Sequence, residues 1–138
     1  IIESTGIVVD SGYGITQIAA YEDGKYIEGS SKTLNFGGKD LSRWLNVMFQ
    51  CREYFSPFIT NRDIEIIKKT KTFVNEKSDI FKNISESLYY FEISNDPITI
   101  KEEAYYCPEP FFNQSAIDEF LEKYYSGSHK AFYKGCND

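Results

Sequence analysis

The sequence lacks the patterns that identify several common classes of protein. No apolar run approaches the roughly 20 residues that a helix needs to cross a bilayer, and the start shows no secretory signal. The three cysteines, Cys51, Cys107 and Cys136, form no CxxC pair, so their spacing indicates neither a zinc site nor a disulfide framework. We therefore expect a protein of a reducing compartment, neither secreted nor inserted in a membrane.

An excess of positive charge is also missing. With 21 acidic and 15 basic residues the net charge is −6, and no basic stripe runs along the chain. Direct binding to nucleic acid is therefore not expected. The most marked basic cluster, Lys68, Lys69 and Lys71, fits a solvated helix face. The single histidine, His129, is expected at the surface and not as a catalytic base.

What the chain does contain is a distinctive stretch near its start, Gly6–Gln17. Val8 and Val9 continue an apolar, β-branched run that is typical of a buried strand. Gly12 and Gly14 permit a tight turn and the close approach of a ligand. Such a turn can direct successive N–H groups at a phosphate oxygen.

An acidic residue completes this pattern. Asp10 is expected at the end of the first strand, where a carboxylate can hold Mg²⁺ or its water shell. The stretch therefore predicts a phosphate-binding hairpin. An ordinary hairpin is the alternative, and the motif alone favours it, because Asp, Ser and Gly dominate turns of all kinds.

The rest of the chain mixes strands and helices. Apolar residues three and four positions apart predict a helix that begins near Asp40, with Trp44 as a core anchor. Thr60 caps a second helix and Asp63 completes its capping box. Ser115 caps another helix, which Gly127 ends before a short last helix over 128–133. The expected strands are 5–9, 15–21, 26–28, 32–36, 88–93 and 98–100, the last two joined through Asn95-Asp96-Pro97. Pro108 and Pro110 flank a turn. The predicted fold class is α/β (mixed α+β).

Taken in order, several segments resemble the actin and actin-related protein family. Residues 5–16 resemble its second phosphate loop, and residues 34–41 its strand, glycine turn and helix start. Residues 60–74 resemble its long helix, and Cys107–Phe112 its "CPE" segment. The resemblance implies part of the actin-like ATPase fold, which is ribonuclease H-like, with an inserted small helical subdomain. It covers only the middle of an actin.

The resemblance also implies a division of the chain. Residues 1–36 would form the phosphate-hairpin sheet of the nucleotide-binding half, and residues 37–110 the inserted outer subdomain. Residues 111–138 would carry helices back toward the nucleotide-binding half. Other loops of the nucleotide site would lie upstream and downstream, so the isolated segment is expected to be inactive as an ATPase.

In the complete protein the implied cofactors are ATP and Mg²⁺. Asp10 matches the acid that holds the Mg²⁺ through water, and the phosphate loop corresponds to Ser11, Gly12, Tyr13 and Gly14. Lys68 matches the lysine on the nucleoside side, and a one-residue shift gives that role to Lys69 instead. The neighbouring family glutamate is absent, since Lys69 or Thr70 stands there.

Two departures from conventional actins bear on catalysis. Tyr13 replaces a second Asp beside the phosphates, and Gln17 replaces a His near the attacking water. Glutamine can hydrogen-bond a water but cannot accept its proton near neutral pH. Nucleotide binding through backbone amides is compatible with both changes, whereas fast hydrolysis is not expected.

Four functions remain open at this point. The first is an ATP-binding cytoskeletal protein of the actin type, with Gln17 at the catalytic position. The second is a nuclear actin-related protein that acts as a non-catalytic scaffold of a chromatin-remodelling complex. A sugar kinase or heat-shock ATPase, and a degenerate gene fragment, are the others. Expected partners are actin or actin-related subunits and actin-binding or remodeller proteins, in the cytoplasm or nucleus.

Overall fold

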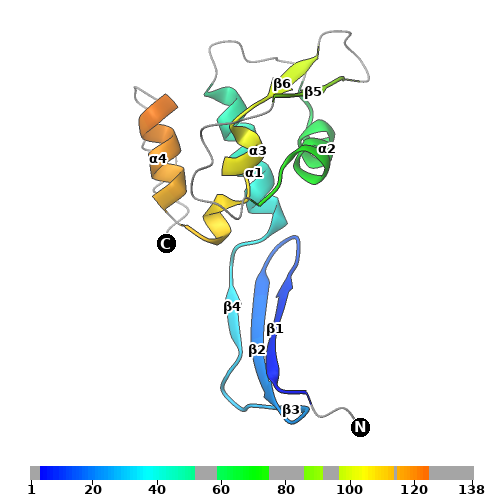
Figure 1. Ribbon diagram of the computed structural model, residues 1–138, viewed down its shortest axis with the longest axis vertical. Helices are drawn as coiled ribbons and strands as arrows, with labels where there is room; N and C mark the ends of the chain where they lie inside the picture. Colours follow the sequence, from blue (N-terminus) through cyan, green and yellow to red (C-terminus); the bar gives the residue numbers. More distant parts are fainter. Residues whose placement is uncertain (1–3, 52–58, 75–85, 92–96, 114, 125–138) are drawn as a thin grey trace. The chain divides into compact units, whose positions relative to one another are not determined.

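The computed structural model describes residues 4–51, 59–74, 86–91, 97–113 and 115–124 (Figure 1). The chain forms two compact units, Ile1–Arg43 and Trp44–Asp138, and each is described by itself. The first contains a four-stranded sheet, and the second contains helices and a two-stranded sheet. The predicted mixed α/β class is therefore confirmed, while the three-part division predicted from the sequence stays a prediction.

The central strand of the first sheet is β2, Thr16–Glu22. It pairs antiparallel with β1 (Gly6–Ser11), β3 (Lys25–Tyr26) and β4 (Lys32–Leu34). The pair Asp23-Gly24 joins β2 to β3 with φ values of 49° and 74°, as the common two-residue hairpin turn requires. The strands expected in this region are all present, with ends shifted by one or two residues.

The exposure of the edge strand β1 differs from the sequence-based expectation. Every residue of β1 is exposed, and Ile7, Val8 and Val9 are 72%, 55% and 60% exposed. The prediction that Val8 and Val9 lie in a buried strand is wrong, since these neighbouring residues project from opposite faces of the sheet and both are exposed. Within the described residues of this unit, nothing packs over its apolar side chains.

Helix α1, Gly38–Gln50, has the predicted apolar stripe. Residues at three- and four-residue spacing fall on one helical face, and the buried ones are Trp44, Leu45, Met48 and Phe49. Trp44 is the predicted core anchor, since its indole N–H donates to the carbonyl of Tyr106 over 2.9 Å. The ring of Phe120 packs edge-on against the rings of Trp44 and Tyr106, at centroid distances of 5.3 and 5.2 Å respectively.

Helix α2, Asn61–Lys71, begins with the predicted capping box. The Thr60 hydroxyl accepts from the N–H of Asp63 at 3.2 Å, and the Asp63 carboxylate accepts from the N–H of Thr60 at 2.9 Å. The Tyr89 hydroxyl donates to the same carboxylate at 2.8 Å. Burial tends to raise the pKa of Asp63, but the hydrogen bonds from Thr60 and Tyr89 outweigh burial and lower it.

The predicted second hairpin is present but shorter. Strands β5 (Ser87–Tyr89) and β6 (Ile98–Ile100) pair antiparallel, with Ser87 opposite Ile100. The first strand ends at Tyr89 instead of residue 93, and residues 92–96, which include most of the predicted turn, lie outside the described residues. The side chains of Tyr89 and Ile100 are buried, so this small sheet contributes to the core of the second unit.

The last described segment is more helical than predicted. It contains α3 (Glu103–Tyr106), a 3₁₀ helix (Glu109–Phe111) where a turn was expected, and α4 (Ser115–Tyr124). Ser115 is the first residue of α4 and not its cap. The side-chain oxygen of Asn113 accepts from the N–H of Ser115 at 3.1 Å and so takes the capping role.

The remaining expectations fall outside the described residues. These are the helix end at Gly127, the short helix 128–133, His129 and Cys136. In the part of the chain that the structure describes, no helix has the length and apolar character needed to cross a membrane.

The carboxylate of Asp63 yields a stability prediction. Tyr89→Phe removes a hydrogen bond to a buried charge and should lower the free energy of unfolding by about 2 kcal/mol at pH 7.

The lowered folded-state pKa of Asp63 stabilises the fold above the unfolded pKa of about 3.9, and this contribution is lost as pH falls through the folded pKa. Tyr89→Phe should therefore also move acid unfolding to higher pH. Urea and acid unfolding followed by circular dichroism measure both effects, with the exposed Tyr90→Phe as control; equal behaviour of the two variants would contradict the prediction.

Candidate functional site

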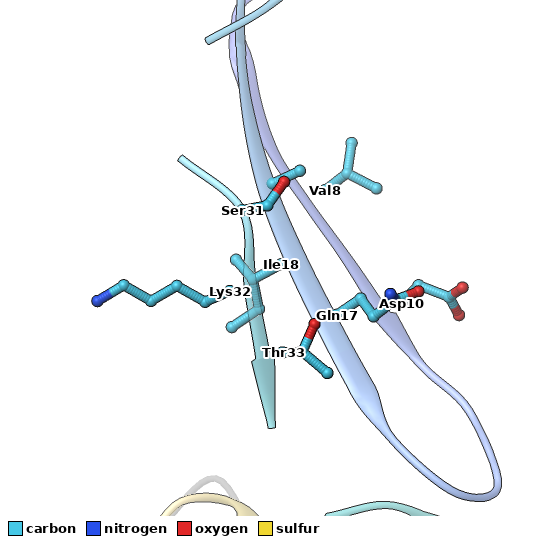
Figure 2. Close-up of a pocket in the computed structure, with 8 residues that line it drawn as sticks. Val8, Asp10, Gln17, Ile18, Ser31, Lys32 and Thr33 are labelled. Carbon is cyan, nitrogen blue, oxygen red and sulfur yellow. The ribbon is translucent and has the colours of Figure 1, made fainter. Parts of the chain in front are cut away.

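Asp10 and Gln17, two of the predicted site residues, lie opposite each other in the first sheet. The strand register pairs Asp10 of β1 with Gln17 of β2, and Gln17 with Thr33 of β4. Residues directly opposite in antiparallel strands share a face, so the three form a polar row across the sheet. In Figure 2 the side chain of Gln17 extends beside that of Asp10.

The polar row borders a shallow hollow (Figure 2), lined by Val8, Asp10, Gln17, Ile18, Ala19, Ser31, Lys32 and Thr33. Sequence reasoning missed Thr33. The residue is visible as a candidate only once the register of β2 and β4 is known, because a shift of one residue would move its side chain to the other face.

The Asp10 carboxylate suits a hydrated cation. It is exposed and makes no hydrogen bond or ion pair with any described residue. Magnesium usually retains several waters and takes one or two carboxylates together with substrate phosphates. Among the described residues, no three His, Cys, Asp or Glu side chains gather into a metal site. A cation at Asp10 would therefore need water and ligand phosphate to complete its shell.

The hairpin tip, residues 12–15, is bonded to the start of α1. The N–H of Gly38 donates to the Gly12 carbonyl at 3.0 Å, and the N–H of Lys39 donates to the Tyr13 carbonyl at 2.8 Å. The first N–H groups of a helix have no partner inside the helix, so the tip satisfies two of them. Both carbonyls of the tip consequently point toward α1.

The direction of these carbonyls determines the direction of two N–H groups. In a trans peptide the N–H points opposite to the C=O of the same unit, so the N–H groups of Tyr13 and Gly14 are directed away from α1. The N–H of Gly12 instead donates to the Ile15 carbonyl at 2.9 Å and closes the tip. The N–H groups of Tyr13 and Gly14 are therefore directed to one side of the tip. The N–H of Gly12 instead stabilises the shape of the tip.

Gly37 permits this close approach. A Cβ at this position would lie 2.7 Å from the Gly12 carbonyl oxygen and 2.8 Å from that of Tyr13, closer than side-chain carbons approach. The N–H of Gly37 donates to the Asp40 carboxylate at 2.9 Å. Asp40 lies in the first turn of α1, as predicted from the sequence.

Ser11 differs from the other candidates in its side chain. Its hydroxyl lies 3.0 Å from that of Thr16, the residue opposite it in the sheet. Neighbouring residues of a strand point to opposite faces, so Ser11 and Asp10 do not share a face. Any contact of Ser11 with a ligand bound at the polar row would run through its backbone.

Lys68, the nucleoside-side candidate, belongs to the second unit and is described within that unit alone. Its side chain is 12% exposed, and its ammonium lies 2.8 Å from the Glu65 carboxylate. Lys69 is exposed. The structure does not decide between the two lysines.

The described cysteines offer no nucleophile. Burial raises the pKa of the Cys51 thiol to about 11 and that of the Cys107 thiol to about 12. Both are therefore protonated near neutral pH, and a thiol is far less reactive than a thiolate.

Comparison with known proteins gives a consistent result. A family model described as Actin matches residues 2–133. The chain is 29% identical over 123 residues to Actin-related protein 2 of Acanthamoeba castellanii, covering 83% of this chain and 31% of that protein. It is 31% identical over 128 residues to Actin-related protein 3 of Schizosaccharomyces pombe, covering 85% and 29%. It is also 51% identical over 41 residues to Actin-like protein 8 of Homo sapiens, covering 30% and 11%. The chain thus spans less than a third of each relative.

The contact at Gly37 can be tested by substitution. Gly37→Ala should push the hairpin tip away from α1 and lower the free energy of unfolding by about 1–3 kcal/mol, since the added methyl meets backbone atoms. Gly6→Ala is the matched control, because a Cβ there meets nothing within 4 Å. Urea unfolding of both variants provides the measurement. A Gly37→Ala variant as stable as the control would show that the tip does not approach Gly37 so closely.

Proposed function

The chain belongs to the actin family, and we propose that in the complete protein its hairpin forms part of one wall of an ATP-binding cleft. The observation that carries the proposal is the backbone of the tip, where the N–H groups of Tyr13 and Gly14 are directed away from α1. Phosphate oxygens accept hydrogen bonds, and consecutive N–H groups in a turn suit them. This arrangement favours a phosphate-binding hairpin over an ordinary hairpin.

Asp10 would hold the metal of the nucleotide. Its exposed carboxylate stands at the end of β1, next to the tip, and would contact Mg²⁺ through a water of the ion's shell. When bound, Mg²⁺ offsets negative charge on the phosphates. Ser11 and Gly12 would contribute the backbone that leads into the tip, and their N–H groups are not needed as phosphate donors.

Gln17 would orient the water that attacks the γ-phosphate. It lies opposite Asp10 and presents an amide that can donate and accept hydrogen bonds. Because an amide cannot accept a proton near neutral pH, we propose that the complete protein is at most a slow ATPase. ATP would then act mainly as a ligand that favours the closed arrangement of the cleft.

Lys68 would lie on the nucleoside side. Its ammonium is already paired with Glu65 at 2.8 Å, which restricts the side chain and neutralises its charge. A hydrogen bond from Lys68 to an uncharged group of the nucleoside is therefore favoured over binding of a phosphate.

A non-catalytic scaffold is the second candidate function. The observation that favours it is Tyr13 at the hairpin tip, a residue that is 65% exposed. An exposed aromatic residue is a common contact for a partner protein. Unlike the Asp of conventional actins, it supplies no negative charge that could bind a metal. In this role the protein would assemble with actin or actin-related subunits or remodeller proteins, in the cytoskeleton or the nucleus, with nucleotide structural or absent.

The role of Asp10 is directly testable in the complete protein. Asp10→Ala should weaken the binding of Mg-ATP by about 10- to 100-fold, the usual loss when an outer-shell partner of a metal is removed. Glu28→Ala is the matched control, since it removes an exposed carboxylate of the same unit. Isothermal titration calorimetry measures both affinities. Equal affinity of the two variants would sink the proposed role of Asp10, and no binding by the unmodified protein would favour the scaffold.

The position of Gln17 can be tested by gain of function. Gln17→His supplies a group that can accept a proton, and general-base catalysis of this kind is worth about 100-fold or more. We expect phosphate release to increase at least tenfold, with a midpoint near pH 6.5 where histidine titrates. Steady-state phosphate release across pH 5–9 is the measurement. A rate that does not change, or changes without pH dependence, would place the attacking water elsewhere.

A further inference from the structure

Thr16 connects the two strands of the hairpin to the segment that precedes α1. Its side chain is buried, with 4% of its surface exposed. Its hydroxyl oxygen lies 2.8 Å from the carbonyl oxygen of Phe36 and 3.0 Å from the hydroxyl oxygen of Ser11. A buried hydroxyl with two partners constrains three segments of the chain at once.

The donors in this chain of hydrogen bonds can be assigned. A carbonyl oxygen only accepts, so the single proton of the Thr16 hydroxyl is donated to Phe36. Ser11 must therefore donate to Thr16. The hydroxyl proton of Ser11 is used inside the protein and is not available to a phosphate oxygen.

The chain of bonds ends where the hairpin tip meets α1. Phe36 directly precedes Gly37, against which the tip packs, and the N–H groups of Gly38 and Lys39 bind the carbonyls of the tip. Ser11 directly precedes the tip, and Thr16 directly follows it. The Ser11–Thr16–Phe36 chain therefore restrains the base of the tip, while the two backbone bonds restrain its end.

We infer that Thr16 is a positioning residue for phosphate binding, a role that rests on the proposed function. Through Ser11 and Phe36 it sets the orientation in which the tip presents the N–H groups of Tyr13 and Gly14. Thr16 does not touch the ligand, since its side chain is buried on the face opposite Asp10. Its hydroxyl determines how well the tip is preorganised, because each constraint present before binding reduces the cost of ordering during binding.

The test compares Thr16→Val with Thr16→Ser in the complete protein. Valine keeps the shape and removes the hydroxyl, whereas serine keeps the hydroxyl. Affinity for Mg-ATP is measured by calorimetry at a temperature where circular dichroism shows every variant folded. Thr16→Val should weaken binding about three- to tenfold, as expected for one lost hydrogen bond, and Thr16→Ser should bind within about twofold of the unmodified protein.

Thr5→Val is the matched control. Thr5 precedes β1, remote from the tip along the strand, and its hydroxyl oxygen also accepts a hydrogen bond, from the N–H of Asp23 at 3.0 Å. Its loss should lower the melting temperature without changing affinity. If Thr16→Val behaves in the same way, Thr16 stabilises the fold only and the inference is overturned.

The single variant Ser11→Ala provides a test that does not depend on the folding of Thr16→Val. It removes the first donor and keeps the bond between Thr16 and Phe36. Ser11→Ala should also weaken Mg-ATP binding about three- to tenfold, and the double variant with Thr16→Val should lose little more than either single variant, because both break one chain of bonds. Additive losses, or an unchanged affinity of Ser11→Ala, would overturn the inference.

The experiment separates this inference from the proposed function. If the unmodified protein binds Mg-ATP and Asp10→Ala weakens that binding while the Thr16 and Ser11 variants do not, the positioning role alone fails. If the unmodified protein does not bind Mg-ATP, the ATP-binding function and the positioning role fail together.

Discussion

Two backbone hydrogen bonds between the hairpin tip and the start of α1 are the constraint on which the proposed site depends. They satisfy helix N–H groups that have no partner within α1, and they turn the carbonyls of Gly12 and Tyr13 toward the helix. The planarity of the peptide then directs the following N–H groups the other way. Gly37 is the residue that allows this contact, since any side chain there would meet the carbonyl oxygens of the tip.

The sheet register adds a second level of organisation, because it separates the candidate residues by face. Asp10, Gln17 and Thr33 share one face, whereas Ser11 and Thr16 share the other. The first face carries groups able to act on a metal or a water, and the second carries the hydrogen bonds that hold the hairpin. A single short sequence thus supplies both the chemistry and its support, because side chains alternate along a strand.

Features that depend on neighbouring residues were predictable from the sequence. The capping box of Thr60 and Asp63, the apolar stripe of α1 and the four strands of the first sheet all follow from local patterns. The exposure of Val8 and Val9 was not predictable, because apolar content reports a preference for burial and not whether a covering element is present. The helical turn α3 was missed for a different reason, since four residues are too few to show a period.

The sequence by itself determined the family, the mixed fold class and the residue types of the candidate site, because motifs, spacing and local propensities are properties of the chain. Only the tertiary structure decided which of those residues meet. It placed Gln17 between Asp10 and Thr33, turned the side chain of Ser11 to Thr16, and directed the N–H groups of Tyr13 and Gly14 in the hairpin tip away from α1. These are consequences of strand register and of contacts between segments more than 20 residues apart, and no pattern of neighbouring residues specifies them.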